Sequence, residues 1–308
     1  MPGTSDADDA DDATRAFVDH RELLFSLVYN MLGTVADTED VLQETWLAWA
    51  PRHAARDAEP IGSPRAYLVR IAVNKALARQ SVISRRRETY IGPWLPEPLL
   101  TRAVEPVHEP DAAEAVERAE SVSMALLVVL ETLSPLERAV FVLHEVFGYA
   151  HTETAEIIGR TPAAVRQLAH RAREHVRARR PAGNADARRR REVTERFAEA
   201  VAAGDAETLL RLLAPDVVLW ADGGGKAPGA GPRPLRGPGR VAELLVKRAA
   251  LRPAGAELRY CHINGDPSVL LFNEGAPYAV LVLDLTPDGE RVRGLYNVMN
   301  PDKLAHLA

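Results

Sequence analysis

The pattern of apolar and polar residues predicts helices in the first two thirds of the chain. Apolar residues recur at helical spacing over 14–32, which predicts one amphipathic helix. A second helix is predicted over 38–49, with Thr38 as its cap and Pro51 just beyond its end. The stretch 65–87 is predicted to form a third, longer helix.

A proline-rich segment separates these helices from a second helical region. Five prolines fall between residues 92 and 110, so we expect an extended, flexible linker and a domain boundary there. Helical patterns return over 111–180 and are broken at Ser134-Pro135, at Gly148 and at Gly159. These breaks predict a compact helical domain with several short turns.

The last third of the chain has a different pattern. Helices are predicted near 189–203 and 205–213. Alternating or continuous apolar runs then predict strands at 216–221, 257–263, 268–273, 277–285 and 291–299. Helices followed by several strands are typical of an α+β domain.

The chain is therefore expected to be multidomain, with two all-α helical domains followed by an α+β domain. Its 308 residues allow about two or three domains. The acidic start of the chain has no apolar period and is expected to be disordered. The expected parts are the acidic tail at 1–13, a helical domain at 14–91, a proline-rich linker at 92–112, a second helical domain at 113–180 and the α+β domain at 187–308.

The net charge of -5 hides an uneven distribution. Residues 1–60 carry thirteen acidic and four basic side chains, whereas 65–90 and 160–180 each carry seven basic and one acidic side chain. Two short basic zones in an acidic protein suit phosphate contacts at two separate places. Two solvated helix faces are the alternative that charge alone leaves open.

Cysteine usage and hydropathy favour a cytoplasmic protein. The single cysteine, Cys261, can form neither an internal disulfide nor a cysteine-based metal site. No stretch approaches the roughly 20 apolar residues of a membrane span, and the start of the chain lacks a signal pattern. We expect a cytoplasmic, nucleoid-associated protein with no cofactor, no bound metal and no membrane contact.

Residues 151–176 have the spacing of a helix-turn-helix. Two short helices flank Gly159, and the second opens with Thr161 as a cap and Pro162 in its first turn. Arginine and glutamine side chains suit base edges and phosphates. The candidate DNA-binding residues of this helix are Arg166, Gln167, His170, Arg171 and Arg173, together with Thr161. A surface helix with solvated arginines is the alternative, and the agreement of turn, cap and charge argues against it.

The predicted third helix carries a basic face with aromatic neighbours. Basic and aromatic side chains together suit melted single strands, with Tyr67 and Tyr90 as candidate stacking groups. The candidate DNA-binding residues of this face are Arg70, Asn74, Lys75, Arg79, Arg85, Arg86 and Arg87.

Two runs of sequence in the first helical domain are more specific than its charge pattern. Residues 37–46, DTEDVLQETW, resemble the helix of extracytoplasmic-function sigma factors of bacterial RNA polymerase that docks on the polymerase core. Residues 64–74, PRAYLVRIAVN, are similar to the segment that melts the minus-ten element, which implies that Asn74 lines a pocket for a flipped base. Ala78 departs from the aspartate that is common there. The implied polymerase-binding residues are Asp37, Glu39, Asp40, Leu42, Gln43, Glu44 and Trp46.

The second helical domain resembles the other DNA-binding domain of the same family. Residues 134–141, SPLERAVF, and the helix-turn-helix after them are similar to the part that contacts the minus-thirty-five element. The resemblance implies that 14–91 is sigma region 2 and that 113–180 is sigma region 4. RNA polymerase core and promoter DNA are the implied partners.

Three further motifs are GPWLPEP at 92–98, DGGGK at 222–226 and NPDKL at 300–304. They resemble a sigma-J-like subgroup with a SnoaL-like extension. That extension has a nuclear-transport-factor-like fold, in which helices and a curved sheet surround a cone-shaped pocket. The motifs imply a regulatory contact between the linker and the extension. Its residues are Trp94, Leu95, Pro96, Glu97 and Pro98 in the linker, Asp222, Gly223, Gly224, Gly225 and Lys226, and Asn300, Pro301, Asp302, Lys303 and Leu304.

These resemblances imply a sigma factor whose activity is modulated by its own C-terminal domain. Whether the cone-shaped pocket binds a small molecule is left open. No catalytic residue is assigned, because residues 189–308 contain no clear acid and base pair, and Asp222 at a strand end is a structural, regulatory or catalytic candidate. A ligand-sensing repressor and a small-molecule isomerase or cyclase remain the two alternatives.

Overall fold

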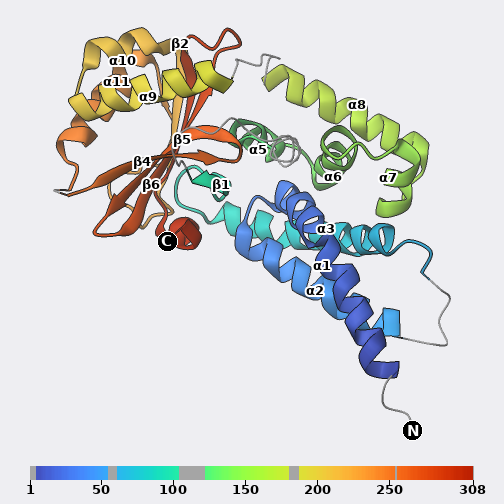
Figure 1. The fold of residues 1–308 in the computed structure, drawn as a ribbon. Helices are drawn as coiled ribbons and strands as arrows, with labels where there is room; N and C mark the ends of the chain where they lie inside the picture. The colour runs from blue at the N-terminus through green and yellow to red at the C-terminus, as the bar shows by residue number, and fades with distance from the viewer. Residues whose placement is uncertain (1–4, 55–60, 104–121, 180–186, 254, 308) are drawn as a thin grey trace. The chain divides into compact units, whose positions relative to one another are not determined.

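The computed structural model describes residues 5–54, 61–103, 122–179, 187–253 and 255–307. The chain divides into two compact units, one made of 1–86 with 130–176 and the other of 87–129 with 177–308. Figure 1 follows the chain through both units. In the described ranges, no helix is both long and apolar enough to cross a membrane.

The first unit is all-helical, as predicted. Its long helices bury one another's apolar faces, with Leu24, Val28, Val41 and Leu68 inaccessible to solvent. The helices of this unit are α1 (Ser5–Leu32), α2 (Val35–Ala54), α3 (Pro64–Glu88), α6 (Pro135–Phe141), a π-helical turn (Val142–Val146), α7 (His151–Ile158) and α8 (Pro162–Arg179).

The prediction of a disordered tail at 1–13 was wrong for the part that the structure describes. Helix α1 begins at Ser5, and residues 1–4 lie outside the described ranges. Alanine has a high helix propensity, and acidic residues are favoured near the positive end of the helix dipole. The first turns are also tied to α2, because the Trp49 indole donates a hydrogen bond to the backbone oxygen of buried Ala13 at 2.9 Å.

The predicted ends of the second helix were also wrong. Helix α2 begins at Val35, so Thr38 lies inside it and its hydroxyl donates to the backbone oxygen of Thr34 at 2.6 Å. The helix continues through Pro51 to Ala54. A proline lacks the backbone N–H and so removes one helical hydrogen bond. Near the end of a helix few turns follow the proline, so this loss disturbs little of the helix.

The helix-turn-helix is confirmed as structure. Gly159 ends α7 in the left-handed conformation with φ of 64°, which a residue without a Cβ adopts readily. The Thr161 hydroxyl accepts a hydrogen bond from the Ala164 backbone nitrogen at 3.2 Å at the start of α8. Ser134 and Glu137 form a capping box at the start of α6.

The second unit is α+β, as predicted, and is built on a seven-stranded sheet with the order β1-β4-β5-β6-β7-β2-β3. Neighbouring strands are antiparallel except for β2 and β7, which are parallel. The strands are β1 (Leu100–Ala103), β2 (Leu213–Asp222), β3 (Leu235–Arg236), β4 (Glu257–Ile263), β5 (Asp266–Asn273), β6 (Ala276–Leu285) and β7 (Val292–Val298). The helices are α5 (Met124–Leu130), α9 (Ala187–Ala203), α10 (Ala206–Leu212), α11 (Pro238–Ala250), α12 (Pro301–Leu304) and a final turn (Ala305–Leu307).

Both faces of this sheet are covered. Helices α9, α10 and α11 pack on one face through Phe197, Leu209 and Val241, as their position beside the strands in Figure 1 shows. The other face buries Leu95 and Met124 with the β4 to β7 side chains. Helix α11 was not predicted, because it follows a glycine- and proline-rich stretch and its cap position is a glycine without a capping side chain.

The linker at 92–112 is not free over its described part. Residues 92–103 are extended, as predicted, but strand β1 pairs with β4, with Leu100 opposite Ile263. Residues 104–112 lie outside the described ranges. Helix α5, which lies within the predicted second helical domain, clusters with the α+β unit, where Met124 is fully buried. Burial of apolar side chains such as Leu95 against the sheet holds the linker in place, although its prolines predicted a flexible segment.

Candidate functional site

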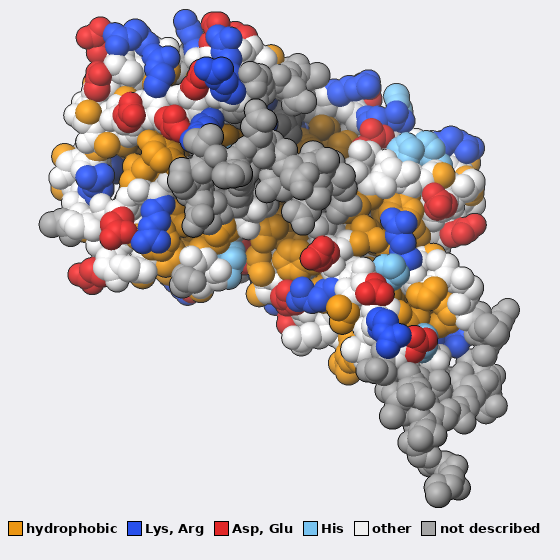
Figure 2. Space-filling view, in the orientation of Figure 1, with side chains coloured by type: hydrophobic (Ala, Val, Ile, Leu, Met, Phe, Trp, Pro, Cys, Tyr) orange, Lys and Arg blue, Asp and Glu red, His pale blue; other side chains and the backbone are white. Residues whose placement is uncertain are grey.

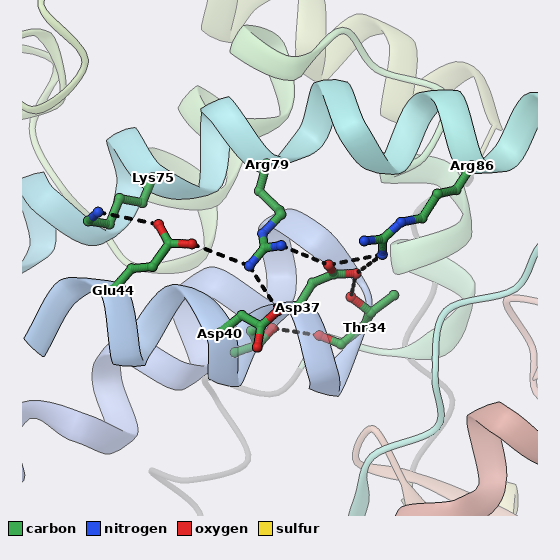
Figure 3. A network of polar contacts seen from close by, with 8 residues as sticks. Thr34, Asp37, Asp40, Glu44, Lys75, Arg79 and Arg86 are labelled. Carbon is green, nitrogen blue, oxygen red and sulfur yellow. Dashed lines mark hydrogen bonds and ion pairs between the residues drawn. The ribbon is translucent and has the colours of Figure 1, made fainter. Parts of the chain in front are cut away.

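Charged residues of α2 and α3 pair with one another, as Figure 3 shows. Lys75 Nζ lies 3.3 Å from Glu44 Oε2. Arg79 donates to Asp40 at 2.9 Å and to Glu44 at 3.4 Å. Two residues expected to bind DNA, Lys75 and Arg79, are therefore paired with two expected to bind polymerase along the seam between the two helices.

The most buried member of this network is Asp37. Its carboxylate accepts hydrogen bonds from the Thr34 hydroxyl at 2.9 Å and from Arg86 at 3.1 Å. Only 5% of Asp37 is exposed. A carboxylate so covered by its own chain is not available to a partner protein, so its sequence-predicted role in polymerase binding is not supported by its position.

The remaining predicted polymerase-binding residues surround one hollow, which we call the α1–α2 hollow. It has a volume of about 460 Å³ and is open to solvent. Trp46 contacts Phe17 edge to face at 5.4 Å, and Leu47 on the rim is 70% exposed. The residues around the hollow are Phe17, Arg21, Glu39, Leu42, Gln43, Trp46 and Leu47.

The basic face predicted on α3 is only partly free. Arg70 and Arg85 are exposed, whereas Lys75, Arg79 and Arg86 are bound to α2 carboxylates. The candidate stacking residue Tyr67 packs against Trp49, with ring centroids 5.9 Å apart.

Asn74 is engaged within the first unit. Its side-chain amide donates to the backbone oxygens of Arg70 at 2.7 Å and Ile157 at 2.9 Å. Ile157 belongs to α7 of the helix-turn-helix. The amide predicted to meet a flipped base is thus occupied by a backbone carbonyl.

Helix α8 presents the predicted DNA-reading side chains. Its apolar face, with Val165, Leu168 and Ala172, is buried. The exposed side chains are Arg166, Gln167, His170 and Arg171. Figure 2 shows basic side chains and histidine gathered over this helix.

Two arginines of α8 are held by acidic residues of the same unit. Arg171 Nε donates to Glu137 Oε1 at 3.0 Å, and Arg173 Nε lies 3.4 Å from Glu145 Oε1. These ion pairs fix the side chains that flank Arg166 and Gln167. The hydrogen bond from Ser134 holds the pKa of Glu137 below its usual range, and Arg171 adds to this effect.

In the second unit, Asp222 is the centre of the contact between the linker and the sheet. Asp222 is fully buried at the end of β2. Its carboxylate accepts hydrogen bonds from the Leu95 backbone nitrogen at 2.8 Å and from the Tyr90 hydroxyl. Its own backbone oxygen accepts from Met299 and Asn300. One residue therefore bonds both the linker and the segment after β7.

Lys303 completes this site. Its ammonium lies 2.8 Å from Asp222 Oδ2, donates to the Leu95 backbone oxygen, and sits 3.6 Å from the centroid of the Trp94 ring. Only 3% of Lys303 is exposed. The ion pair and the cation–π contact together satisfy a charge that would otherwise be costly to bury.

Burial sets the titration of two groups in this site. Burial raises the pKa of Tyr90, and the neighbouring Asp222 carboxylate raises it further. Burial lowers the pKa of Lys303, while Asp222 acts in the opposite direction. The Tyr90 hydroxyl donates to Asp222 and accepts from Asn300, so this candidate stacking group is engaged within the second unit.

The glycines after Asp222 allow close approach. At Gly224, where φ is +57°, a Cβ would lie 2.4 Å from Asn300 Nδ2 and 3.0 Å from the Tyr90 hydroxyl. A Cβ at Gly223 would lie 2.3 Å from Ala230, and one at Gly225 would lie 2.9 Å from Ile91. Close contacts therefore disfavour a side chain at Gly223 and Gly224, whereas at Gly225 the constraint is the positive φ of +73°.

The other motif residues hold the same segments in place. The Asn300 amide donates to the Tyr90 hydroxyl at 2.8 Å, and its oxygen caps α12 by accepting from the Asp302 nitrogen. Lys226 pairs with Asp302 on the surface. Pro96 and Pro98 are buried, Glu97 is partly buried, and Leu304, which follows Pro301 in α12, is buried in the core with Leu95.

Some contacts of this site had no signal in the sequence. His306 Nε2 lies 2.7 Å from the Pro98 backbone oxygen, and Asn264 bonds the backbone of Leu99. Arg87, predicted to bind DNA, has its guanidinium 5.0 Å from the centre of the Trp94 ring. Cys261 is buried in the same core, where burial raises its pKa to about 12.

Comparisons with known proteins agree with the two helical regions. A family model described as "Sigma-70 region 2" matches residues 16–86, and one described as "Sigma-70, region 4" matches residues 123–176. The chain is 38% identical over 296 residues to "ECF RNA polymerase sigma factor SigJ" of Mycobacterium tuberculosis, covering 92% of this chain and 90% of the relative. It is 31% identical to "Probable ECF RNA polymerase sigma factor SigI" of the same species, covering 96% of each.

A solved structure matches nearly the whole chain. The crystal structure of the Mycobacterium tuberculosis extracytoplasmic function sigma factor SigJ superposes with a TM-score of 0.72 and 35% identity, covering 95% of this chain and 98% of that chain. The predicted order of two helical regions followed by an α+β domain is confirmed. On this evidence the chain belongs to the extracytoplasmic-function (ECF) RNA polymerase sigma factors, which are transcription initiation factors and not enzymes.

Proposed function

We propose that this chain directs RNA polymerase core to promoters through three surfaces of its first unit, and that its C-terminal domain controls this activity through the linker. The α1–α2 hollow binds core polymerase. Helix α8 reads duplex DNA at the minus-thirty-five element. The exposed part of α3 meets the melted strand at the minus-ten element.

The α1–α2 hollow has the composition of a protein-binding surface. It combines a partly exposed aromatic residue, Trp46, with Leu47, which is 70% exposed. Large exposed apolar side chains around a hollow favour a protein partner. Gln43 and Glu39 supply a polar rim. The acidic residues on the α3 side of α2 instead stabilise the helix pair.

Helix α8 has the arrangement that major-groove binding requires. Arg166 and Gln167 lie near the N-terminal end of an exposed, basic helix that follows a tight turn. Such residues can pair with guanine and adenine edges. Arg171 and Arg173, held by Glu137 and Glu145, are suited to phosphates and to keeping the helix in register.

At the minus-ten element, Asn74 needs a change of partner. Its amide donates to Ile157 of α7, so a flipped base can be bound only after that hydrogen bond breaks. Arg70 and Arg85 are exposed and available to the backbone of the melted strand. The helix-turn-helix and α3 must therefore move apart before promoter opening.

The linker carries the proposed control. The observation that supports it best is that the Leu95 backbone nitrogen donates to Asp222 and the Leu95 backbone oxygen accepts from Lys303. Tyr90 follows the end of α3 closely, and α5, which is bound to the same sheet, closely precedes α6. Both ends of the connection between regions 2 and 4 are thus attached to the C-terminal domain. That attachment limits how far the two regions can separate on polymerase.

Run-off transcription with purified core polymerase tests the proposal. The full chain and the variants Asp222→Asn and Lys303→Met are compared over a promoter library. We expect both variants to change transcript yield or promoter preference at least about threefold, because the linker loses its charged partners. Arg211→Met, which removes only an exposed ion pair with Glu207 on α10, is the matched control.

Two outcomes would contradict the proposal. If both variants transcribe as the unaltered chain does, the linker contact does not control activity. If the full chain and both variants direct core polymerase to no promoter of the library, the assigned polymerase and DNA surfaces are wrong.

A further inference from the structure

The C-terminal domain contains a cavity that the proposed function does not use. It has a volume of about 370 Å³ and lies between α9, α11 and the helix-covered face of the sheet. Its walls are mainly apolar, with Val201, Leu245, Val269 and Leu281 among them. A mostly apolar cavity of a few hundred Å³ with a few polar groups is typical of a small-molecule site.

Two arginines line this cavity, exposed Arg252 just beyond the end of α11 and half-buried Arg248 of α11. The Arg248 guanidinium donates to the Gly229 backbone oxygen and to the Met299 sulfur, the latter at 3.2 Å. With the Asn297 amide oriented so that both its ends are satisfied, the Asn297 oxygen also accepts from Arg248 at 3.3 Å. All three partners are neutral.

The cavity offers Arg248 no negative charge. Among the described residues, no carboxylate lies within ion-pair distance of Arg248, and none of the residues lining the cavity is acidic. Burial lowers the pKa of Arg248, which shows that the charged form is partly desolvated. A cation in apolar surroundings without a counter-charge is costly, and an anionic ligand would remove that cost.

We propose that this cavity binds a small apolar molecule with a single carboxylate, with the carboxylate on Arg248 and the apolar body against the α9 and β5–β6 side chains. The planar guanidinium suits a carboxylate because it can form two parallel hydrogen bonds. The Tyr278 hydroxyl, on a side chain 37% exposed at the cavity mouth, is a second polar contact for the same group.

The site is placed to affect the linker contact, a consequence that rests on the proposed function. Met299, which contacts Arg248, donates its backbone nitrogen to the Asp222 backbone oxygen at 2.7 Å. The next residue, Asn300, bonds Tyr90. A carboxylate that draws Arg248 away from Met299 would therefore act on the segment that holds Asp222 and the linker.

Binding is tested with the full chain and decanoate as the probe, measured by calorimetry and by the shift in melting temperature. We expect saturable binding of decanoate, at least about tenfold weaker binding of decanol, and none of decyltrimethylammonium, because only the acid meets Arg248 with a negative charge. Equal affinity for the acid and the alcohol would overturn the proposal. So would the absence of binding by straight-chain acids of six to fourteen carbons.

Variants give a second, independent comparison. Arg248→Met should lower decanoate affinity at least about tenfold, to the level of decanol, and Arg248→Lys should retain part of it. Arg211→Met, which removes an exposed arginine of α10, is the matched control and should bind as the unaltered chain does. Unchanged decanoate binding by Arg248→Met would contradict the proposed site. If that variant fails to fold, the comparison of decanoate with decanol on the unaltered chain still tests the proposal.

The effect on transcription is measured separately. Decanoate is expected to change run-off transcription by the unaltered chain and not by Arg248→Met. Binding without any change in transcription would contradict the link between cavity and linker while the binding site stands. Because binding is measured without polymerase, its failure is distinguishable from failure of the proposed control by the linker.

Discussion

Lys303 and Asp222 form an ion pair, 2.8 Å between Nζ and Oδ2, from which solvent is excluded. The two charged groups also need further hydrogen-bond partners from the linker. The Leu95 backbone donates to the carboxylate and accepts from the ammonium, and the Trp94 ring covers the ammonium. The linker is therefore a structural part of the ion pair, and displacing it would leave two buried charges with fewer partners than they need.

Removing one member of this pair should release the linker. In Lys303→Met the Asp222 carboxylate keeps its buried position without its counter-charge, a change that costs about 3–5 kcal/mol in comparable sites. We expect the Leu95 amide to exchange its hydrogen at least about 100-fold faster, as measured by hydrogen exchange and mass spectrometry. The double variant Asp222→Asn/Lys303→Met should lose less than the sum of the single losses, and a sum that is strictly additive would show that the residues are not coupled.

The turn after Asp222 should tolerate no side chain at its centre. Gly224→Ala places a Cβ 2.4 Å from the Asn300 amide at a backbone φ of +57°. We expect the free energy of unfolding of the C-terminal unit to fall by about 1–3 kcal/mol, measured by denaturant titration. Gly231→Ala, whose nearest neighbour beyond the adjacent residues would be 3.8 Å away, serves as the control. A loss no larger than that of the control would show that the turn adjusts without strain.

The elements of the fold could be predicted where local sequence decides them. The long basic helix was expected at 65–87 and is found at Pro64–Glu88, because apolar residues recur at helical spacing from Leu68 to Ile83. The helix-turn-helix was predicted from Gly159 and Thr161, whose roles in a turn and a cap depend on their near neighbours alone. Strands β4 to β7 follow in the same way from their apolar runs.

Contacts between distant segments could not be predicted in the same way. The prolines of the linker indicated an extended chain, which is correct, but its pairing with β4 depends on a strand far along the chain. Charge patterns showed which helix faces are charged, yet not that Arg79 would meet Asp40 and Glu44. Asn264 and His306 bond the linker only because the fold brings them to it. For the linker motif, the resemblance to a subgroup indicated the contact where spacing could not.

The α1–α2 hollow gives a sharper test of polymerase binding than the acidic residues of α2. Leu47→Asp places a charge on the exposed apolar rim, and we expect affinity for core polymerase to fall at least about tenfold. Stability should hardly change, because Leu47 is 70% exposed. Leu210→Asp, at a 47% exposed leucine of α10, is the matched control.

Pull-down titration of core enzyme measures this effect. Equal affinity of Leu47→Asp and Leu210→Asp would exclude the hollow from the interface. Charge reversal at Asp40 or Glu44 is less informative, because it also breaks the ion pairs with Arg79 and Lys75.

Arginines of α8 should differ in their effect on DNA binding. Arg166 is exposed and near the start of the helix, so Arg166→Ala should weaken binding of duplex promoter DNA by about 1–3 kcal/mol and relax the preference at one base pair. Arg171→Ala should weaken binding less, because Glu137 already neutralises part of its charge. Fluorescence anisotropy with polymerase holoenzyme at several salt concentrations measures both. Arg196→Ala, which removes an exposed arginine of α9, is the control. A loss equal to that of Arg166→Ala would point to nonspecific charge effects.

The capping box of α6 predicts a pH dependence of stability in the first unit. The hydrogen bond from Ser134 holds the pKa of Glu137 below its ordinary value of 4.5, so the ionised carboxylate stabilises the folded state. This contribution is complete above the ordinary pKa and is lost as the pH falls through the lowered pKa of the folded state. Glu137→Gln should therefore lower stability by about 1 kcal/mol at neutral pH, and the difference from the unaltered chain should shrink below pH 4.5. Thermal unfolding measured from roughly pH 3 to pH 7 checks this difference, because the range includes both protonation states of the carboxyl group. Glu207→Gln, in an exposed ion pair on α10, is the control and should change stability by less than about 0.5 kcal/mol. A loss of stability in Glu137→Gln that does not depend on pH would show that the carboxylate acts through packing and not through its charge.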